Sequence, residues 1–534
     1  MGNKRVKKAY RLLGIGLIAE LFIVFLNSGT VQGINHRADN LKVYAAAERE
    51  DKEILPGNIY DCNENEIVVT DYQTITESTE KGETERTVRT TTYAHGKAYS
   101  QLVGYTGTRE LNPLADNTED VVGNRRDYRL MAYLDETAWG ENGLYSTVDA
   151  DGTRGQSAVL TIDSTLQEYV YGVLSQEMSD SGEIGSAVVM DAKTGKILSM
   201  VSFPTYDFNN LAEARQQMMY DEENTNLEPG FPVTYKNSET PGSIFKVLIA
   251  VALIDHDMED FKVVNVPYTV AGWTCQTYAY QSPTLSVGIG EEIDLETALN
   301  ISSNVYFSQA ALALGADRIR ETAEKFHLIE NSFVDENQDG KDDRDGHLEE
   351  EDQTYLELDF GNVEYNWDLA VEDDVLAQTG FGQGRTELTT VYAAMITQAI
   401  ANNGKMMKPY VIEKLVDANG KAVYEGEETS LGKATSSATA HKVAEAMRST
   451  AVECCNLHNL SSVKSVFDKY QVAGKTGTAE NGDKEDTTNA WYISFAPADD
   501  PQYVVVVNQC KTHKSGYRMM SAVANIYSYL FENF

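Results

Sequence analysis

Two residues one helical turn apart, Ser243 and Lys246, carry the strongest chemical signal in this sequence. Pro241 and Gly242 precede them and mark a turn into a helix, so we expect the serine in the first turn and the lysine on the same face. Every residue from Ile244 to Ile254 except this lysine is apolar, which indicates a buried helix. Burial disfavours an ammonium group, so this amine should have a lowered pKa and accept the proton of the hydroxyl. The pair predicts a serine nucleophile that needs no histidine.

The Ser-x-x-Lys pattern is weak evidence by itself, because the chain contains it four times. A lysine near a helix start commonly lies along apolar surface with its amine in water. The other three copies lie in polar stretches that predict no buried lysine: Ser78 to Lys81, Ser430 to Lys433 and Ser461 to Lys464. Two further motifs favour chemistry at the copy that begins with Ser243.

The first is Ser302-Ser303-Asn304, which separates two apolar helical stretches, Leu295 to Asn300 and Val305 to Leu314. Hydroxyl and carboxamide groups in apolar surroundings require hydrogen-bond partners, and a neighbouring serine-lysine pair would supply them. Taken alone, the trio is more typical of a loop that ends in a helix N-cap.

The second is Lys475-Thr476-Gly477-Thr478, which follows a short predicted strand, Tyr470 to Ala473. It offers a cation, two hydroxyls and backbone amides along one edge, where a peptide carboxylate could bind. Lys193-Thr194-Gly195 repeats its first three letters between two apolar runs, Ser186 to Met190 and Ile197 to Phe203. That arrangement predicts a hairpin turn with no chemistry.

With Ser243, Ser302 and Lys475 in this order, the chain resembles the penicillin-binding protein transpeptidases, specifically the single-activity class B type. The likeness continues through further segments in the family's order: Leu160 to Asp163, Val201 to Asp207, Gly380 to Gly384 with Thr389, and Ala479-Glu480 with Ala490-Trp491. The resemblance implies an α/β fold of the penicillin-binding/serine β-lactamase type, with an antiparallel sheet flanked by helices. It also implies that no cofactor is required.

The resemblance further implies a peptidoglycan D,D-transpeptidase. Ser243 would attack the carbonyl of a D-Ala-D-Ala stem peptide, with Lys246 as base, and the amine of a second peptide would resolve the acyl-enzyme into a cross-link. Ser302 would relay a proton to the departing D-alanine, and Asn304 would hold Lys246 and the substrate amide. Because β-lactam antibiotics mimic D-Ala-D-Ala, they are implied as inhibitors that acylate the same serine.

The resemblance assigns the strand motif to substrate binding. Lys475, Thr476 and Thr478 would hold the terminal carboxylate, with Gly477 between the two threonines. The backbone amides of Ser243 and Thr478 would form an oxyanion hole.

Two alternatives share these motifs. A D,D-carboxypeptidase or a β-lactamase differs only in letting water reach the acyl-enzyme, and a non-catalytic penicillin sensor or scaffold of a wall-synthesis complex would keep binding without turnover. The motifs determine neither the acceptor amine nor a role in elongation, division or sporulation. The resemblance suggests a polytopic glycan polymerase as a membrane partner.

The N-terminus predicts a membrane anchor. Residues 1–11 are rich in Lys and Arg, and residues 12–33 are mainly apolar and long enough to cross a bilayer. Because positive charge stays inside, we expect a cytoplasmic tail, a single uncleaved span and an extracytoplasmic remainder, in preference to a cleaved signal peptide. Glu20 near midspan either faces a partner's transmembrane helix or is tolerated as the neutral acid.

Composition supports an extracytoplasmic protein of about two domains. The chain has 534 residues, of which 42% are apolar and 24% charged, and its net charge of -38 argues against nucleic-acid binding. Five cysteines form neither a disulfide framework nor a Cys-x-x-Cys metal site.

We predict a pedestal domain at residues 34–155 and a catalytic domain at residues 156–534. Pro56 to Asn63 resembles the motif with which the family's pedestal begins, but arginines that are usual at the places of Pro56 and Cys62 are missing. This makes the usual pedestal contacts doubtful.

The catalytic domain should contain one antiparallel sheet, packed against a closing helix from Tyr517 to Phe531 and, on its other face, against the helices of Ser243 and Val305. Its expected strands are the hairpin around Gly195, the Lys475 strand, Ala490 to Ala496 and Tyr503 to Asn508. The active site should lie where the helices meet the sheet.

An acidic insertion at residues 335–352 departs from the family pattern. Its alternating oxygen-bearing residues match the spacing of calcium loops around Gly340: Asp335, Asn337, Asp339 and Asp343. The twelfth position, where an EF-hand needs an acid, is Gly346. The insertion is therefore either a structural calcium site or a solvated acidic loop.

Overall fold

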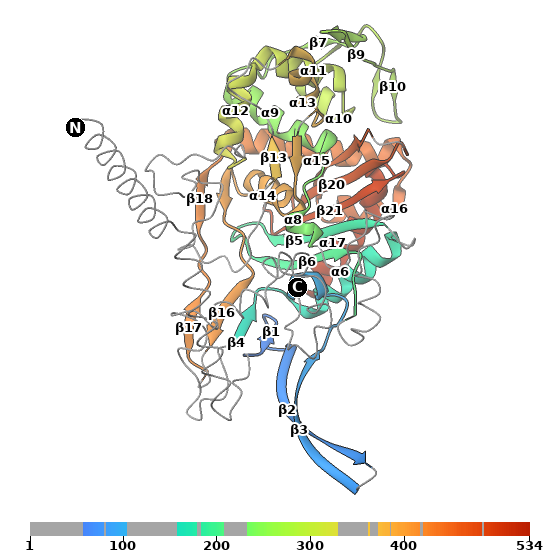
Figure 1. Ribbon diagram of the computed structural model, residues 1–534. Helices are drawn as coiled ribbons and strands as arrows, with labels where there is room; N and C mark the ends of the chain where they lie inside the picture. Colours follow the sequence, from blue (N-terminus) through green and yellow to red (C-terminus); the bar gives the residue numbers. More distant parts are fainter. Residues whose placement is uncertain are drawn as a thin grey trace, which may run out of the picture.

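The computed structural model describes residues 57–79, 82–103, 157–178, 183–207, 232–328, 361–363, 372–384, 386–416, 420–482 and 485–534. These form a sheet with helices on both faces, a largely helical lobe and a long hairpin that projects from the opposite end (Figure 1). None of the helices in these ranges is both long and apolar enough to span a bilayer. The predicted anchor at residues 12–33 and the predicted calcium loop lie outside them.

The central sheet is antiparallel, with strand order β19-β20-β21-β5-β6. Its strands are β5 (Ile184–Asp191), β6 (Ile197–Phe203), β19 (Ala473–Glu480), β20 (Thr488–Ala496) and β21 (Tyr503–Thr512). All four segments predicted for this sheet contribute strands to it, so the predicted sheet is confirmed. The strand expected at Tyr470 to Ala473 is wrong, because β19 begins only at Ala473 and contains the Lys475 motif itself. Lys193-Thr194-Gly195 lies in the β5–β6 turn, where the Asp191 carboxylate accepts the backbone N–H groups of Lys193 and Thr194 at 2.9 and 2.8 Å.

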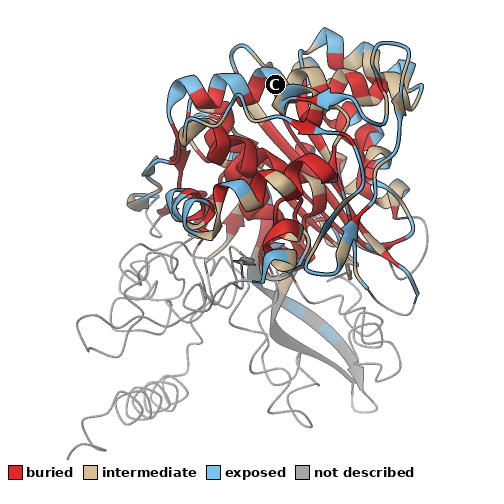
Figure 2. Ribbon diagram, turned by 90° about the horizontal axis from the view of Figure 1, so that it is seen from above, coloured by how far each residue is buried: buried red, intermediate tan, exposed pale blue. Residues whose placement is uncertain are grey.

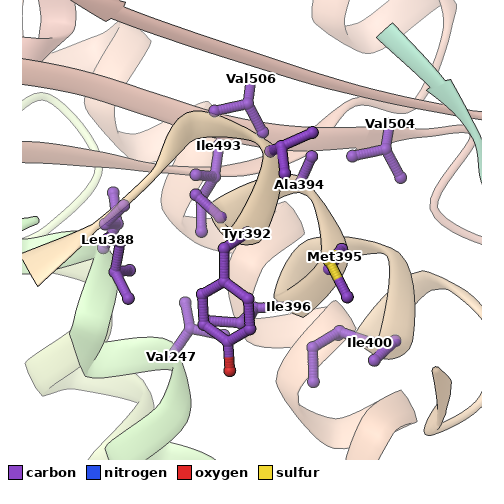
Figure 3. Close-up of a cluster of buried hydrophobic side chains, with 14 of the residues drawn as sticks. Val247, Leu388, Tyr392, Ala394, Met395, Ile396, Ile400, Ile493, Val504 and Val506 are labelled. Carbon is purple, nitrogen blue, oxygen red and sulfur yellow. The ribbon is translucent and has the colours of Figure 1, made fainter. Parts of the chain in front are cut away.

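Helices cover both faces of this sheet. On one face lie α6 (Ser164–Glu177) and α17 (Met520–Asn533). The predicted closing helix is thus present, but its first turn is a 3₁₀ turn, Gly516–Met519. On the other face α14 (Thr390–Ala401) is buried along its whole length between the sheet and the helix that follows Ser243 (Figure 3).

The helical lobe contains the predicted Ser243 and Ser302 segments. Its main helices are α9 (Lys246–Asp255), α10 (Leu295–Asn300), α11 (Asn304–Leu314), α12 (Ala316–Lys325) and α13 (Asp373–Thr379). Short strands between α9 and α10 form small hairpins: β7 (Val263–Val264), β8 (Tyr268–Val270), β9 (Trp273–Cys275), β10 (Tyr280–Gln281), β11 (Ser286–Val287) and β12 (Glu292–Ile293). Between lobe and sheet runs α15 (Ser437–Leu457), followed by α16 (Ser461–Lys469). The lobe thus places the Ser243 and Ser302 segments beside the edge strand β19.

A second sheet joins the N-terminal strands to later parts of the chain, in the order β17-β16-β4-β1-β2-β3. Its members are β1 (Ile59–Tyr60), β2 (Glu66–Thr79), β3 (Gly82–Tyr93), β4 (Ser157–Leu160), β16 (Ile412–Val416) and β17 (Ala422–Glu425). Because β1 pairs with β4, the boundary expected between residues 155 and 156 separates strands of one shared sheet. The division into pedestal and catalytic domains stays a prediction.

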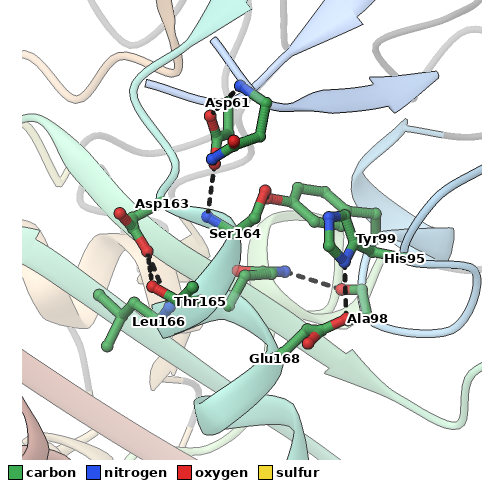
Figure 4. Close-up of polar contacts among 11 residues, drawn as sticks. Asp61, His95, Ala98, Tyr99, Asp163, Ser164, Thr165, Leu166 and Glu168 are labelled. Carbon is green, nitrogen blue, oxygen red and sulfur yellow. Dashed lines mark hydrogen bonds and ion pairs between the residues drawn. The ribbon is translucent and has the colours of Figure 1, made fainter. Parts of the chain in front are cut away.

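Hydrogen bonds join the N-terminal strands to the start of α6, and none of those drawn in Figure 4 involves an arginine. The buried Asp61 carboxylate accepts the backbone N–H of Ser164, the first residue of α6, at 3.2 Å. The Ser164 hydroxyl lies 3.0 Å from the Tyr99 hydroxyl, and His95 pairs with Glu168 at 2.6 Å. The start of α6 is therefore fixed by residues that precede residue 104.

Cys62 lies at one of the two positions where the family resemblance leads us to expect an arginine. Its thiol lies 3.9 Å from the Asp163 carboxylate. We expect Cys62→Arg to stabilise the protein by about 0.5–1 kcal/mol, because a guanidinium at this exposed position would pair with that carboxylate. Thermal unfolding would measure the change. Cys62→Leu is the uncharged control, and an equal gain for both variants would contradict the ion-pair explanation.

Candidate active site

Ser243 lies in a 3₁₀ turn, Gly242–Phe245 (η3), and α9 begins only at Lys246. The sequence predicted that Ser243 lies in the first turn of an α-helix, but it lies in a tighter 3₁₀ turn before the helix. Residues three apart eclipse one another in a 3₁₀ helix, so Ser243 and Lys246 still share a face. Ser243 is half-buried, whereas Lys246 is completely buried.

Three elements hold this turn in place. The Gly242 N–H donates to the Gly382 carbonyl at 2.9 Å, and the Trp491 indole N–H donates to the Thr240 carbonyl at 3.0 Å. Strand β19 packs directly against the turn, because a Cβ on Gly477 would lie only 2.6 Å from the Pro241 carbonyl oxygen. The glycine in the Lys475 motif is therefore what lets the strand approach the serine so closely.

Ser302 lies in the turn between α10 and α11 with φ of 53°, a conformation that is rare for a residue with a side chain. Ser303 is the N-cap of α11 and accepts the Tyr306 N–H at 3.1 Å. Both interpretations of the trio therefore hold: its middle residue caps a helix, and Ser302 and Asn304 contact a lysine.

The three motifs meet at two buried amines. Lys246 Nζ lies 2.6 Å from the Ser302 carbonyl oxygen, 3.1 Å from Ser302 Oγ and 2.7 Å from Asn304 Oδ1. Lys475 Nζ lies 2.9 Å from the same Ser302 Oγ and 3.0 Å from the Thr476 carbonyl oxygen. A single hydroxyl thus bridges two lysines that are 229 residues apart in the sequence.

Burial lowers the pKa of both lysines. The Lys246 pKa lies well below its ordinary value, first because the amine is desolvated and second because Lys475 is nearby. Desolvation lowers the pKa of Lys475 to about 8. Because both burial and the neighbouring Lys475 lower the Lys246 pKa, we expect the amine on α9 to lose its proton before the amine on β19 does.

The rest of the strand motif lies at an open edge, because β19 is the outermost strand of its sheet. Thr476 is half-buried and Thr478 is exposed. The Thr478 hydroxyl accepts the Gly516 N–H at 3.0 Å, so it is held by η5, the 3₁₀ turn before α17. An edge strand with free backbone groups can pair with an extended peptide.

The expected contact between Ser243 and Lys246 stays a prediction. Within the described part of the chain, the Ser243 hydroxyl makes no hydrogen bond, and the Lys246 amine is directed at Ser302 and Asn304. Catalytic contacts are often long before substrate binds.

Two supporting residues were missed by sequence reasoning. The buried Asn489 amide donates to Glu239 Oε2 at 2.9 Å, and its oxygen accepts the Lys511 N–H at 3.0 Å. Glu239 also exchanges backbone hydrogen bonds with Leu388, so the segment leading to the nucleophile is fixed from two sides. The signal was an asparagine that precedes the mainly apolar run of the β20 strand.

No cluster of three or more His, Cys, Asp or Glu side chains is placed to hold a metal ion in the described ranges. The candidate calcium ligands at residues 335–343 lie outside those ranges. Calcium binding by the acidic insertion therefore stays a prediction.

The fold is that of transpeptidase domains. The structure of the D,D-transpeptidase domain of a peptidoglycan glycosyltransferase from Eggerthella lenta superposes with a TM-score of 0.64 at 22% identity, covering 89% of this chain and 98% of that one. The penicillin G acyl-enzyme complex of penicillin-binding protein A from M. tuberculosis gives 0.64 at 22% identity, covering 90% and 100%.

Sequence comparison agrees with the fold. The family model described as "Penicillin binding protein transpeptidase domain" matches residues 185–529, and the chain belongs to this family. The chain is 26% identical over 426 residues to the peptidoglycan D,D-transpeptidase PbpA of Mycolicibacterium smegmatis, with 78% of each chain covered. It is also 26% identical over 434 residues to penicillin-binding protein 3 of Bacillus subtilis, covering 78% of this chain and 58% of that one.

Proposed function

We propose that this protein is a peptidoglycan D,D-transpeptidase that cross-links stem peptides through an acyl-enzyme on Ser243. The observation that carries the proposal is the Ser302 hydroxyl, held within 3.1 Å of Lys246 and 2.9 Å of Lys475 beside the turn that contains Ser243. The family membership and the similarity to a peptidoglycan D,D-transpeptidase support the same reaction.

Hydrogen-bond counting supports Lys246 as the base. A neutral amine has two N–H donors and one lone pair. The two donors match the Ser302 carbonyl oxygen at 2.6 Å and Asn304 Oδ1 at 2.7 Å, which leaves the lone pair available to accept a hydroxyl proton. In this state the charged Lys475 donates to Ser302 Oγ.

This arrangement provides a proton path. Lys246 would take the Ser243 proton as the serine attacks the peptide carbonyl. Ser302 would then pass its own proton to the departing D-alanine amine as the C–N bond breaks, and would take a proton from the Lys246 ammonium in return, so that Lys246 is neutral again. Asn304 would keep Lys246 in place throughout. The steps reverse when the acceptor amine attacks the acyl-enzyme, so that amine loses its proton along the same path.

Substrate would bind along the exposed edge of β19. An extended stem peptide would pair with the strand, and its terminal carboxylate would lie near the Lys475 ammonium and the Thr476 hydroxyl. The backbone amides of Ser243 and Thr478 would stabilise the oxyanion. Loss of one such donor typically costs about 3–4 kcal/mol of transition-state stabilisation.

The two lysine pKa shifts predict a bell-shaped pH dependence of acylation by penicillin. The rate should rise with pH as Lys246 loses its proton, and fall near pH 8 as Lys475 loses the charge that binds the carboxylate. The Lys475→Arg variant should be acylated more slowly, but its acylation rate should not fall at alkaline pH, because a guanidinium stays charged. Stopped-flow acylation between pH 6 and 10 would measure both profiles.

The control for this profile is Lys193→Arg, in the turn that repeats the motif's letters. It should keep the wild-type profile. A wild-type rate that stays constant to pH 9.5, or a Lys475→Arg profile that falls as the wild type does, would contradict the proposed charge on Lys475.

Time-resolved mass spectrometry would separate the proposed function from its alternatives. We expect a long-lived penicillin adduct on Ser243 and, with a stem-pentapeptide and an acceptor amine, a cross-linked product with release of D-alanine. Rapid loss of the adduct would identify a β-lactamase. Hydrolysis of the peptide without cross-linking would identify a carboxypeptidase, and an adduct with no peptide turnover would identify a sensor or scaffold.

The membrane assignments belong to the same proposal. A span at residues 12–33 with the catalytic domain outside would place Ser243 where peptidoglycan is assembled, and Glu20 would be available to a membrane partner such as a polytopic glycan polymerase. Calcium, if bound at residues 335–343, would have a structural role and would take no part in the acyl-transfer chemistry.

A further inference from the structure

A long stretch of the helical lobe carries no charge. Residues 263–290, which connect the Ser243 helix to the Ser302 segment, contain no Asp, Glu, Lys, Arg or His, in a chain that is 24% charged with a net charge of -38. We call this stretch the uncharged lip. Its hairpins, including β7, β9 and β10, lie together at the outer end of the lobe (Figure 1).

Seen from above, exposed segments surround the buried helices (Figure 2). The lip belongs to the exposed surface, although its composition is not that of an ordinary surface. Five large apolar side chains are exposed in the described ranges, and four of them belong to the lip: Val264, Val266, Tyr278 and Ile289. Beside them the lip exposes neutral hydroxyl and amide groups: Thr269, Thr274, Gln276 and Gln281. Exposed apolar side chains concentrated in this way mark a binding surface.

The lip is continuous with the active site. Trp273 on β9 stacks on Phe381 with ring centroids 5.9 Å apart and planes 16° apart. Phe381 precedes Gly382, whose carbonyl accepts the Gly242 N–H next to Ser243. Strand β9 also packs against α11, the helix that begins with Asn304. A substrate that extends out of the site on this side would meet the lip.

Two buried side chains hold the lip rigid. Asn265 donates to the Gly288 carbonyl at 3.2 Å and to the Tyr278 carbonyl at 3.5 Å, which joins three of its loops. The buried Glu453 carboxylate on α15 accepts the Tyr280 hydroxyl at 3.0 Å and also the hydroxyls of Ser282 and Thr284. A surface ordered in advance binds with a smaller entropy cost.

We propose that the uncharged lip binds the glycan strand from which the stem peptide extends. This inference rests on the proposed function, because it assigns a second part of the same substrate. Sugar rings offer apolar C–H faces and neutral hydroxyls, which match an exposed aromatic ring beside hydroxyl and amide side chains. Cell-wall strands carry peptide carboxylates, which a strongly acidic protein repels, and the lip itself contributes no negative charge.

The test uses the full chain and the double variant Tyr278→Ala, Gln276→Ala. We expect about tenfold slower turnover of stem peptides attached to glycan strands, mainly through a higher KM, because the variant loses an exposed aromatic ring and a neighbouring amide that would contact the sugar rings. Penicillin acylation and turnover of the isolated stem pentapeptide should stay within twofold of wild type. The matched control is Phe534→Ala, which removes an exposed aromatic side chain outside the lip.

Direct binding separates this inference from the proposed function. Glycan strands stripped of peptide by an amidase should bind the wild type and the Ser243→Ala variant equally, and should bind the double variant at least fivefold more weakly. If these strands bind wild type and double variant alike, or if peptide and glycan substrates lose activity equally, the inference is overturned. It is also overturned if the double variant loses only self-association of the chain, which would make the lip a protein interface.

Discussion

Ser243→Ala is expected to remove covalent labelling by penicillin completely and to lower transpeptidation by a factor of about 10⁴ or more, because no other group would form the ester. The hydroxyl makes no hydrogen bond within the described structure, so its loss should leave the fold unchanged. Gel fluorescence with a labelled penicillin and intact-protein mass spectrometry would measure the adduct. Thermal unfolding would show that the variant is folded.

The chain provides a matched control for this variant. Ser461 begins α16 and repeats the Ser-x-x-Lys spacing with Lys464, but it is exposed and its lysine pairs with Asp468 on the surface. Ser461→Ala should therefore label as the wild type does. Equal labelling of Ser243→Ala and wild type would show that the ester forms elsewhere and would remove the basis of the proposed function.

Lys246→Met is expected to slow acylation by a factor of about 10²–10⁴, the usual contribution of a general base. Methionine fills a similar volume, and it removes an amine whose burial is unfavourable. It leaves the Ser302 carbonyl and Asn304 Oδ1 without their donor, so we expect a small change in the free energy of unfolding of either sign. A large loss of acylation rate with little change in the free energy of unfolding would show that Lys246 contributes to catalysis and not to stability.

Two measurements would check this expectation. The remaining acylation of Lys246→Met should lose the rise with pH at the acidic side, because the group that titrates there has been removed. The control Lys442→Met removes a surface lysine that pairs with Glu259 and should keep the wild-type rate. An acylation rate of Lys246→Met within tenfold of wild type would contradict the role of this amine as base.

Local patterns were sufficient to predict the elements that carry the site. The apolar run after Ser243 is a buried helix, the repeat Lys193-Thr194-Gly195 is a turn, and the four segments assigned to the central sheet pair within it. These features depend on short-range periodicity and turn chemistry, which one segment of sequence contains in full. The same pattern predicted a buried Lys246 with a lowered pKa, and the structure agrees with this prediction.

The sequence patterns predicted the details of backbone geometry less well. The first turn at Ser243 is a 3₁₀ turn, and the closing helix begins at Met520 rather than Tyr517. Ser302 adopts a left-handed conformation that its residue type does not favour. In each case contacts from distant elements determine the local backbone conformation, and the conformational preferences of the residues themselves do not predict it.

The sequence by itself determined which side chains can act: a serine and lysine on one turn, a polar trio between two helices and a lysine on a strand. Only the tertiary structure decided that they meet. The contacts from Ser302 to Lys246 and Lys475 span 56 and 173 residues, and they form because Gly477 and Gly382 let β19 and the loop after α13 approach the serine turn. Such distances depend on how whole elements pack, to within a fraction of an ångström, and no local pattern contains that information.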